Sequence, residues 1–408
     1  MKQVFNNRNF VTLWAAQMIE QIGDSFTLMA LIGWAMSLRV DGSAAGNMSM
    51  LMFWIGLPIL VLGPIAGVFV DRFKKRNILA VAAICRGLLI FVIYLLVADK
   101  ARGAYVYLLV FMISVVSQFF IPAKSALIPH IVEEKDLLDA NSLSATTAIV
   151  VQILTYAASG VIIAEIGPQK ALFINSIIYA AVFITVMFVR PKEGEITLPK
   201  NEAVVVWNDF VRGLTFLMTN AKVFFVMRRV FLLMIAVGFF YIALTGNFIH
   251  IIINNSGLHI KDIKALGFMQ AFLGIGLVAG MFIVKSLLNW VKEEVLIRVI
   301  FPILGALVIT LYIFPDFFYL LFVAVAAGIG AVMIISIAET MIQKNTPEKL
   351  RGRIFSTYYI LRGVGLAAAT SLTGVLARFV KEQHIVLYSG IALFTYGFLT
   401  LWRRVKEK

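Results

Sequence analysis

The chain has 408 residues, of which 61% are hydrophobic and only 14% are charged, and its mean hydropathy is +0.92. Soluble globular proteins are about half apolar and about a quarter charged. The composition therefore excludes a disordered chain, a secreted disulfide scaffold and a soluble enzyme, and it indicates an integral membrane protein. Cys85 is the only cysteine, so neither an intrachain disulfide nor a zinc site of several thiolates can form. The formal net charge of +14 suits nucleic acid, but its distribution favours membrane topology instead.

A membrane-spanning helix needs about 20 mostly apolar residues. The sequence predicts twelve such spans, separated by short breaks with turn residues or charges, at 10–38, 47–70, 77–98, 104–122, 141–165, 171–190, 223–253, 263–285, 295–314, 317–343, 354–378 and 385–402. No cleavable signal peptide is expected, because the first apolar stretch is too long for one and contains Glu20 and Asp24.

Basic residues predict the orientation of these spans. With both termini in the cytoplasm, the inner segments hold 26 Lys and Arg and the outer loops hold 8, while Arg86 and Arg362 fall inside spans. Such an asymmetry between alternate loops is the positive-inside signal. We therefore expect a multi-pass protein of the plasma (inner) membrane, with both termini cytoplasmic, that has the lipid bilayer and not nucleic acid as a partner.

An internal repeat divides the chain into two halves. Three pairs of short motifs recur at an offset of 213 or 214 residues: Gly63 to Gly67 with Gly276 to Gly280, Glu134-Lys135 with Glu348-Lys349, and Ser159-Gly160-Val161 with Thr373-Gly374-Val375. The glycine pairs are expected to pack helices closely. The repeat predicts a six-helix bundle over 1–190, a cytoplasmic linker over 191–222 and a second bundle over 223–408, with a site near the middle of the membrane. Within the linker, the apolar spacing over 203–218 favours an interfacial helix, with a plain linker as the alternative.

The loop between the second and third spans resembles the signature loop of the major facilitator superfamily, Gly-x-x-x-Asp-Arg followed by basic residues. It reads Gly67-Val-Phe-Val-Asp71-Arg72-Phe-Lys-Lys75-Arg76. The resemblance implies the fold of that superfamily, an all-α membrane protein with twelve transmembrane helices in two six-helix bundles. It also implies a cytoplasmic gate formed by Gly67, Asp71, Arg72 and Arg76. In the second half Val284 stands where Asp71 would be, so the two halves differ at this gate.

Three further stretches are similar to the macrolide-efflux and enterobactin-exporter-like drug exporters. They are Gln17-Met-Ile-Glu-Gln-Ile-Gly-Asp24, Phe120-Ile-Pro-Ala-Lys124 with the Ala140-Asn141 pair, and Arg351-Gly-Arg-Ile-Phe-Ser356. Lysophospholipid transporters share the Pro-Ala-Lys stretch and the Ala-Asn pair. The Gly-Pro-rich fifth-span motif of drug antiporters is absent, since Thr155 to Gly160 stands there, and this departure weakens the case for antiport.

Four polar residues of the first span, Gln17, Glu20, Gln21 and Asp24, share one helical face. Both acids lie near the middle of the membrane, where two carboxylates one turn apart repel, so one of them is expected to hold a proton near neutral pH. Glu20 is the preferred coupling residue and Asp24 its support, although a packing role is open for each. Glu339, nearer the inner end of its span, is a third candidate that also suits a gate.

Arg86 and Arg362 are the obvious counter-charges within the spans. Arg86 is expected to be structural, because the superfamily places the third span at the periphery, whereas Arg362 is equally suited to structure and to the cavity. Hydrogen-bonding residues inside the spans are candidates for the substrate cavity or for contacts between helices: Gln17, Gln21, Gln118, Gln152, Tyr241, Thr245, Asn247, Gln270 and Arg362.

The sequence has no P-loop for ATP, no dinucleotide fingerprint after a strand and no His-Glu-x-x-His metal motif. We therefore expect no cofactor, no metal and no enzymatic activity. The preferred function is that of a monomeric secondary transporter that exports amphipathic or hydrophobic small molecules by alternating access. It would be coupled to protons, in the multidrug or macrolide style. The alternatives are a lysophospholipid flippase, a siderophore exporter and, from another class, a membrane sensor that does not transport.

Overall fold

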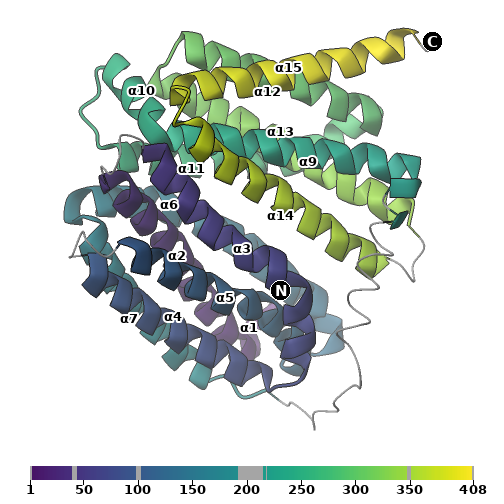
Figure 1. The fold of residues 1–408 in the computed structure, drawn as a ribbon. Helices are drawn as coiled ribbons and strands as arrows, with labels where there is room; N and C mark the ends of the chain where they lie inside the picture. The colour runs from purple at the N-terminus through teal and green to yellow at the C-terminus, as the bar shows by residue number, and fades with distance from the viewer. Residues whose placement is uncertain are drawn as a thin grey trace. The chain divides into compact units, whose positions relative to one another are not determined.

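The computed structural model describes residues 2–38, 44–97, 103–191, 215–216, 218–346 and 351–406, and these residues form helices and no strands (Figure 1). The helices of the first half are α1 (Lys2–Asn6), α2 (Arg8–Ser37), α3 (Ala44–Asp71), α4 (Lys75–Val97), α5 (Gly103–Leu127), η2 (Ile128–His130), η3 (Glu134–Asp136), α6 (Leu137–Ile166) and α7 (Pro168–Met187). Those of the second half are α9 (Ala221–Ala243), η4 (Leu244–Phe248), α10 (Ile249–Asn255), α11 (Asp262–Leu288), α12 (Glu293–Ile313), α13 (Phe317–Lys344), α14 (Arg351–Leu376) and α15 (Glu382–Lys406).

Each predicted span coincides with one long helix, and α9, η4 and α10 together form the seventh. Within the described part of the chain, ten helices are long and apolar enough to cross a membrane, and α2 and α3 are 30 and 28 residues long. The chain is therefore an all-α, multi-pass membrane protein. The interfacial helix predicted over 203–218 lies outside the described residues, apart from 215–216 and 218, as does most of the linker over 191–222.

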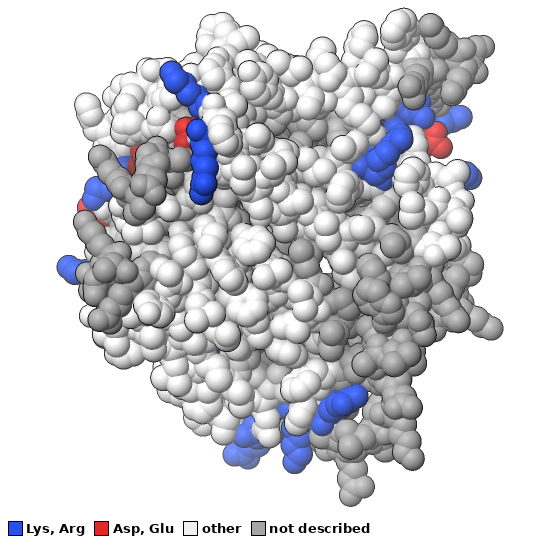
Figure 2. All heavy atoms as spheres, in the orientation of Figure 1, with Lys and Arg blue, Asp and Glu red and all other residues white. Residues whose placement is uncertain are grey.

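The exposed surfaces of these helices are strongly apolar. Phe282, Phe318 and Phe398, for example, are exposed, as is common for side chains that face lipid. On the face shown in Figure 2, Lys and Arg side chains gather in a few places and leave broad uncharged areas over the helices. This pattern fits a bilayer, because a charge that faces hydrocarbon costs a few kcal/mol or more.

The first compact unit contains Met1–Trp34 and Trp54–Trp207. Its most extensive packing is that of α4 against α7 and α5, and α6 also packs on α7 (Figure 1). Helix α4 thus has α5 and α7 as close neighbours. A polar residue on the buried face of α4 must therefore find its partners on the neighbouring helices.

The second compact unit contains Ala35–Phe53 and Asn208–Lys408. Here α11 packs on α13, α12 on α15 and α9 on α14. One continuous hydrophobic core joins α9, α12, α13 and α14. Segment 35–53 contains the end of α2 and the beginning of α3. It belongs to this second unit, although it lies in the first half of the sequence.

The seventh span is broken at Gly246. Its ψ angle of −122° is not helical, and η4 around it is a single π-helical turn. A Cβ atom at this glycine would stand 3.1–3.2 Å from Glu382 and Ala45, so a larger residue would be crowded. A break in a helix usually has a local cause. Here Gly246 has no side chain, and this allows Glu382 and Ala45 to lie close to its backbone.

The glycine motif of the eighth span packs as the sequence predicts. A Cβ atom at Gly276 would overlap the backbone of Val325 on α13, and one at Gly280 would stand 2.9 Å from the Cα of Ile329. Gly328 of α13 in turn lies against α11. Small residues on both helices therefore bring the two backbones together, which is the usual role of a small-xxx-small pair in membranes.

We predict that Gly276→Ala lowers the stability of the protein, because the added methyl group forces α11 and α13 apart. Overpacking typically costs about 1–3 kcal/mol. Thermal unfolding in detergent measures the effect. Ile275→Ala, at an exposed position on the same helix, should change stability much less, and equal losses for the two variants would contradict the packing role of Gly276.

Asp316 joins the loop between α12 and α13 to the end of α10. Its Oδ1 accepts a hydrogen bond from the backbone N of Tyr319 at 2.9 Å, and its Oδ2 accepts one from Ser256 Oγ at 3.0 Å. The backbone hydrogen bond from Tyr319 is the main cause that lowers the pKa of Asp316 below its ordinary value, and the Ser256 hydroxyl adds to it. The folded state therefore prefers the ionised carboxylate.

We predict that Asp316→Ala destabilises the protein by about 1 kcal/mol at pH 7, the usual cost of losing a helix N-cap. Because the pKa of the folded form is lowered, this contribution is present above the unfolded pKa and disappears as the pH falls through the folded one. Thermal unfolding of wild type and variant from pH 7 down to about pH 3 should show the difference shrink. Asp316→Asn, which can still accept the Tyr319 bond, should retain most of the stability, and a deficit that is independent of pH would contradict this assignment.

Candidate functional site

One arginine of the first unit lies between two carboxylates. The Arg86 guanidinium, on α4, forms an ion pair with Glu20 of α2, in which its Nη1 lies 2.8 Å from Oε1, and a second ion pair with Asp24 through Nη2. The side chain of Arg86 is 2% exposed, that of Glu20 8% and that of Asp24 41%. From the sequence we expect Arg86 to be a structural charge. The structure shows that its partners are Glu20 and Asp24, the two acids of the first span.

Tyr179 of α7 completes this cluster. Its hydroxyl donates a hydrogen bond to Asp24 Oδ1, and the Arg86 guanidinium lies over its ring, 4.5 Å from the centroid. Cation–π contact and a shared carboxylate thus bring α2, α4 and α7 together. We call Glu20, Asp24, Arg86 and Tyr179 the acid–arginine cluster.

Two glycines make room for Tyr179. A Cβ atom at Gly23 would stand 3.0 Å from Cε2 of the tyrosine ring, and one at Gly87 would stand 3.1 Å from its Cβ. Each glycine directly neighbours a charged member of the cluster, Asp24 or Arg86. The Gly-Asp pair of the first span therefore has a packing reason, because the glycine lets the ring approach α2 so that its hydroxyl reaches the carboxylate.

A fourth charge lies close to the cluster. Lys124 of α5 is partly buried and interacts electrostatically with Glu20. With both acids ionised, Glu20 and Asp24 balance Arg86 and Lys124, and the formal charge is zero. If one acid takes up a proton, the formal charge becomes +1. Mutual repulsion of two unpaired carboxylates, on which the sequence expectation rested, is thus offset by the arginine between them.

The remaining polar residues of the first span face different neighbours. Gln17 is buried and its Nε2 donates to the backbone O of Ser144 at 2.8 Å, while Trp14 donates to Thr147 Oγ1 at 3.1 Å. Both bonds join α2 to α6. Gln17 is therefore a contact between helices, whereas Gln21 is half-buried and lies on the same face.

The second unit has a similar combination of residues. On α13 and α14, Tyr359 donates to Glu339 Oε1 at a long 3.4 Å, and both Glu339 and Arg362 interact electrostatically with Tyr358 and Tyr359. The structure thus brings the third acid candidate and Arg362 into one neighbourhood. Tyr358 is fully buried there and Tyr359 is exposed.

Tyr241 and Gln270 are brought together as a pair. Gln270 Nε2 on α11 donates to Tyr241 Oη on α9 at 2.9 Å. Tyr241 also lines an apolar cavity of about 190 Å³ inside the second unit, together with residues of α9, α11, α12 and α13. Gln270 does not line this cavity, so Tyr241 brings the one polar side chain to its otherwise apolar wall among the lining residues.

Other cavity candidates form bonds within their own helices. Gln118 Nε2 donates to the Ser114 carbonyl at 3.2 Å, Gln152 Nε2 to Tyr156 Oη at 3.2 Å, and Thr245 Oγ1 to the Ile242 carbonyl at 3.1 Å. Asn247 is exposed. None of these hydrogen bonds joins one of the four residues to another, so they do not define a common site.

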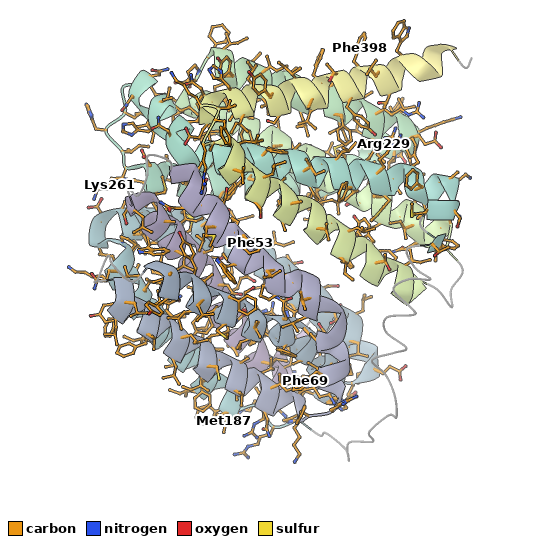
Figure 3. All side chains as sticks on the ribbon, in the orientation of Figure 1. Phe53, Phe69, Met187, Arg229, Lys261 and Phe398 are labelled. Atoms are coloured by element: carbon orange, nitrogen blue, oxygen red, sulfur yellow. The ribbon has the colours of Figure 1, made fainter. Side chains whose placement is uncertain are left out.

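The predicted gate is described only in part. The surroundings of Gly67 and the side chain of Asp71 lie outside what the structure describes, although both residues belong to α3. Arg72 is exposed in the turn after α3, and Arg76 in the first turn of α4 reaches Met187 Sδ, at the end of α7, at 3.8 Å. Phe69 and Met187 lie near the same end of the first unit (Figure 3).

Sequence reasoning missed Tyr179 and gave no role to Lys124. A signal for Tyr179 was present, since it stands one turn after Asn175 among apolar residues of the sixth span. Asn175 is buried and donates to Thr27 Oγ1, which in turn donates to the Gly23 carbonyl at 2.8 Å. Among the described residues no group of three or more His, Cys, Asp or Glu is placed to hold a metal ion.

The transmembrane secretion effector family, MFS_3, matches residues 3–408, and the chain belongs to this family of the major facilitator superfamily. The nucleoside transporter NupG has the same fold, with a TM-score of 0.77 at 11% identity over 97% of this chain and 98% of that one. The chain is thus a transporter of this superfamily and not an enzyme.

Among curated proteins, the chain is similar to exporters. It is 24% identical to macrolide efflux protein A of Streptococcus pyogenes over 93% of this chain and 92% of that protein. It is 25% identical to a putative bacilysin exporter, BacE, of Bacillus amyloliquefaciens over 82% of each. A third relative is the MFS-type transporter YfiS of Bacillus subtilis, which is 29% identical. The matched region covers 46% of this chain and 44% of that relative.

We predict that Arg86→Met strongly destabilises the protein, because it leaves two carboxylates inside a membrane-spanning bundle without their shared cation. Breaking a buried ion pair on one side typically costs about 3–5 kcal/mol, and the exposed side of Asp24 moderates this. Thermal unfolding in detergent measures the loss. The double change Arg86→Met with Glu20→Gln should recover part of it.

Lys170→Met serves as the control, because Lys170 is an exposed cation of the same unit. It should leave the unfolding temperature close to that of the wild type. If Arg86→Met behaves like this control, or if the added Glu20→Gln lowers stability further, then the pairing does not hold the helices together.

Proposed function

We propose that this protein is a secondary active exporter that moves amphipathic or hydrophobic small molecules out of the cell by alternating access, in exchange for protons. The similarity to efflux proteins supports the direction of transport. The acid–arginine cluster carries the proposal of proton coupling, because two carboxylates share one guanidinium within membrane-spanning helices. Such intramembrane charges are typical of proton pathways.

The coupling follows from the formal charge of the cluster and its neighbour. When Glu20 and Asp24 are both ionised, Arg86 and Lys124 balance them. A proton on either acid leaves one positive charge in excess, which disfavours a cationic substrate nearby. Proton binding and substrate binding then exclude each other, and this competition is the requirement for exchange.

Within this scheme Asp24 is the more exposed acid and Glu20 the more buried one. We propose that Glu20 carries the coupling proton and that Asp24, held by Tyr179, passes it between water and Glu20. Uptake depends on all groups that face these acids: Arg86 from α4, Lys124 from α5 and Tyr179 from α7. Glu339 and Arg362 in the second unit are the alternative coupling site.

The same charges favour a class of substrate. A neutral cluster that becomes positive with a proton admits a cationic amphiphile and repels it on protonation, whereas a neutral molecule does not feel this change of charge and an anion is attracted by it. The apolar cavity beside Tyr241 and Gln270 supports an amphipathic partner. We further propose that the protein is a monomer in the plasma membrane with both termini cytoplasmic, and that Gly67, Asp71, Arg72 and Arg76 form its cytoplasmic gate.

We predict that Glu20→Gln abolishes transport driven by a pH gradient but leaves substrate exchange without a gradient intact, since glutamine keeps the shape but cannot cycle a proton. The purified protein in liposomes is given a fluorescent lipophilic cation such as ethidium, or a macrolide, with and without an imposed pH gradient. Gradient-driven accumulation should fall at least about tenfold, and counterflow should stay within about twofold, as expected for a lost proton-transfer step.

Glu165→Gln is the matched control, because it makes the same change at an exposed carboxylate of α6 away from the cluster. It should transport normally. Gradient-driven accumulation by Glu20→Gln at the wild-type level, with the wild-type pH dependence, would show that Glu20 is not the carrier, and Asp24→Asn and Glu339→Gln then test the alternatives. Wild-type flux that ignores the gradient altogether would favour a passive lipid flippase over an antiporter, and the absence of any flux would favour a sensor.

A further inference from the structure

The second unit contains a buried arginine without an acidic partner of its own. Arg229 of α9 is 2% exposed and lies among the helices of the second unit (Figure 3). Its Nη1 donates to the backbone O of Phe225 at 2.9 Å and its guanidinium lies 3.4 Å from the centre of the Phe225 ring. Its Nε has no hydrogen-bond partner among the described residues.

A second arginine lies near the same Phe225 ring. The Arg298 guanidinium, on α12, lies 5.3 Å from the centre of the Phe225 ring, and its Nη1 reaches the Thr400 carbonyl of α15 at 3.4 Å. Its Nε also lacks a partner in the described part of the chain. Arg228, Arg298, Glu294 and Tyr396 all interact electrostatically with Arg229.

The charges at this place do not balance. Arg228 is exposed to the surroundings, so the count concerns Arg229 and Arg298. Glu294 offsets one of these two arginines, Glu293 is paired with Lys344 at 2.7 Å, and no carboxylate of the described residues lies within ion-pair distance of Arg229 or Arg298. One positive charge is left in excess inside the helices. Removing a charge from water without a counter-ion costs several kcal/mol, so the site favours an anion from outside the chain.

An apolar pocket of about 460 Å³ begins one turn after Arg229 on α9, although neither Arg229 nor Arg298 lines it. It lies between α9, α14 and α15 and extends along α15 from Ile385 to Tyr396, a length of about 16 Å at about 1.5 Å per residue. Leu232, one turn after Arg229 on α9, is part of its wall. The Tyr396 end of the pocket is therefore the end nearest to Arg229, and Arg298 contacts α15 one turn further on.

Tyr396 provides a donor at this end. Its hydroxyl is buried and has no hydrogen-bond partner among the described residues, although the residue lines the pocket. The pocket is open on the outer side of α15, where Tyr388 is 58% exposed and Ala392 is exposed. Phe398 and Trp402 continue this exposed apolar surface, and Figure 3 shows Phe398 on the outer side of α15.

We propose that this pocket binds an anionic phospholipid, with one acyl chain along α15 and the headgroup phosphate at Tyr396 and Arg298, in the positive field of Arg229. The apolar wall that opens to the membrane favours a lipid chain, and the unpartnered donors with an excess positive charge favour a phosphate. Basic pockets between membrane helices on the cytoplasmic side bind such headgroups elsewhere. The proposal does not depend on the direction of transport or on its coupling ion.

The experiment uses the full-length protein in detergent after removal of bound lipid. Phosphatidylglycerol and diacylglycerol, which lacks the phosphate, are added in turn with identical acyl chains, and native mass spectrometry measures the bound fraction while thermal unfolding measures stabilisation. Phosphatidylglycerol should bind about tenfold more tightly, as expected for a hydrogen-bonded charge pair. Inorganic phosphate at the same concentration should not compete, because it lacks the chain.

Three variants separate the headgroup from the chain. Tyr396→Phe should weaken phosphatidylglycerol binding several-fold and Arg298→Gln about tenfold, while neither changes the binding of diacylglycerol, which has no phosphate. Ala392→Trp, which fills the pocket, should weaken both lipids. Arg228→Gln is the matched control, since it removes an exposed arginine next to Arg229 on the same helix, and binding should stay within about twofold.

Equal binding of the two lipids by the wild type would overturn the proposal, as would equal losses for Arg228→Gln and Arg298→Gln, which would indicate general surface charge. Competition by inorganic phosphate would assign the donors to a soluble anion and would also overturn it. Thermal unfolding without lipid shows whether each variant is folded. If Arg298→Gln is not folded, Tyr396→Phe removes only one oxygen atom and gives the decisive comparison.

Discussion

The Arg86 guanidinium determines how three membrane-spanning helices of the first unit meet. A bilayer offers no water to a charged side chain, so each ionised group needs a partner of opposite charge or a hydrogen-bonding partner in place of water. Arg86 on α4 finds Glu20 and Asp24 on α2 and the ring of Tyr179 on α7. Because these partners lie on two neighbouring helices, the rotation of α4 about its own axis is fixed by its charge as well as by its apolar face. The glycines at 23 and 87 follow from this arrangement, since a side chain at either place would push Tyr179 out of reach of Asp24.

The sequence predicts the helices much better than it predicts their contacts. Span positions follow from the thickness of the bilayer, which demands about 20 apolar residues whatever the neighbours are. The close packing at Gly276 was also predictable, because small residues four apart serve one purpose in a membrane. Which side chains meet depends instead on the rotation and depth of each helix, and these are set by packing. Gln17 and Glu20 share a face in the sequence, yet Gln17 bonds to α6 and Glu20 to α4. Tyr179 was missed for the same reason, since Asn175 one turn earlier marks a polar face of the sixth span but does not indicate which carboxylate the tyrosine meets.

The two units use the same residue types in different ways. In the first unit an arginine lies directly between two acids. In the second, Glu339 and Arg362 act on a pair of tyrosines, and the Tyr359–Glu339 hydrogen bond is long. The loss of the acid at Val284, opposite Asp71 in the repeat, follows the same trend. The two halves therefore share their helices but differ in their charges. The bilayer requires every span to be helical, whereas charged residues inside a membrane are retained for function.

The buried arginines 86 and 229 meet the same energetic requirement by different means. Arg86 has its counter-charges within the chain, so its pairing can change only when a carboxylate takes up or releases a proton. Arg229 has a backbone carbonyl, the face of Phe225 and an excess positive charge beside an apolar pocket that opens to the membrane. A charge neutralised from within is suited to a cycle of protonation, because the number of protons decides its balance. A charge left over within the chain is suited to a permanent ligand, because only an anion from outside can complete it. This difference is the basis on which we propose that the first unit exchanges protons and that the second binds a lipid.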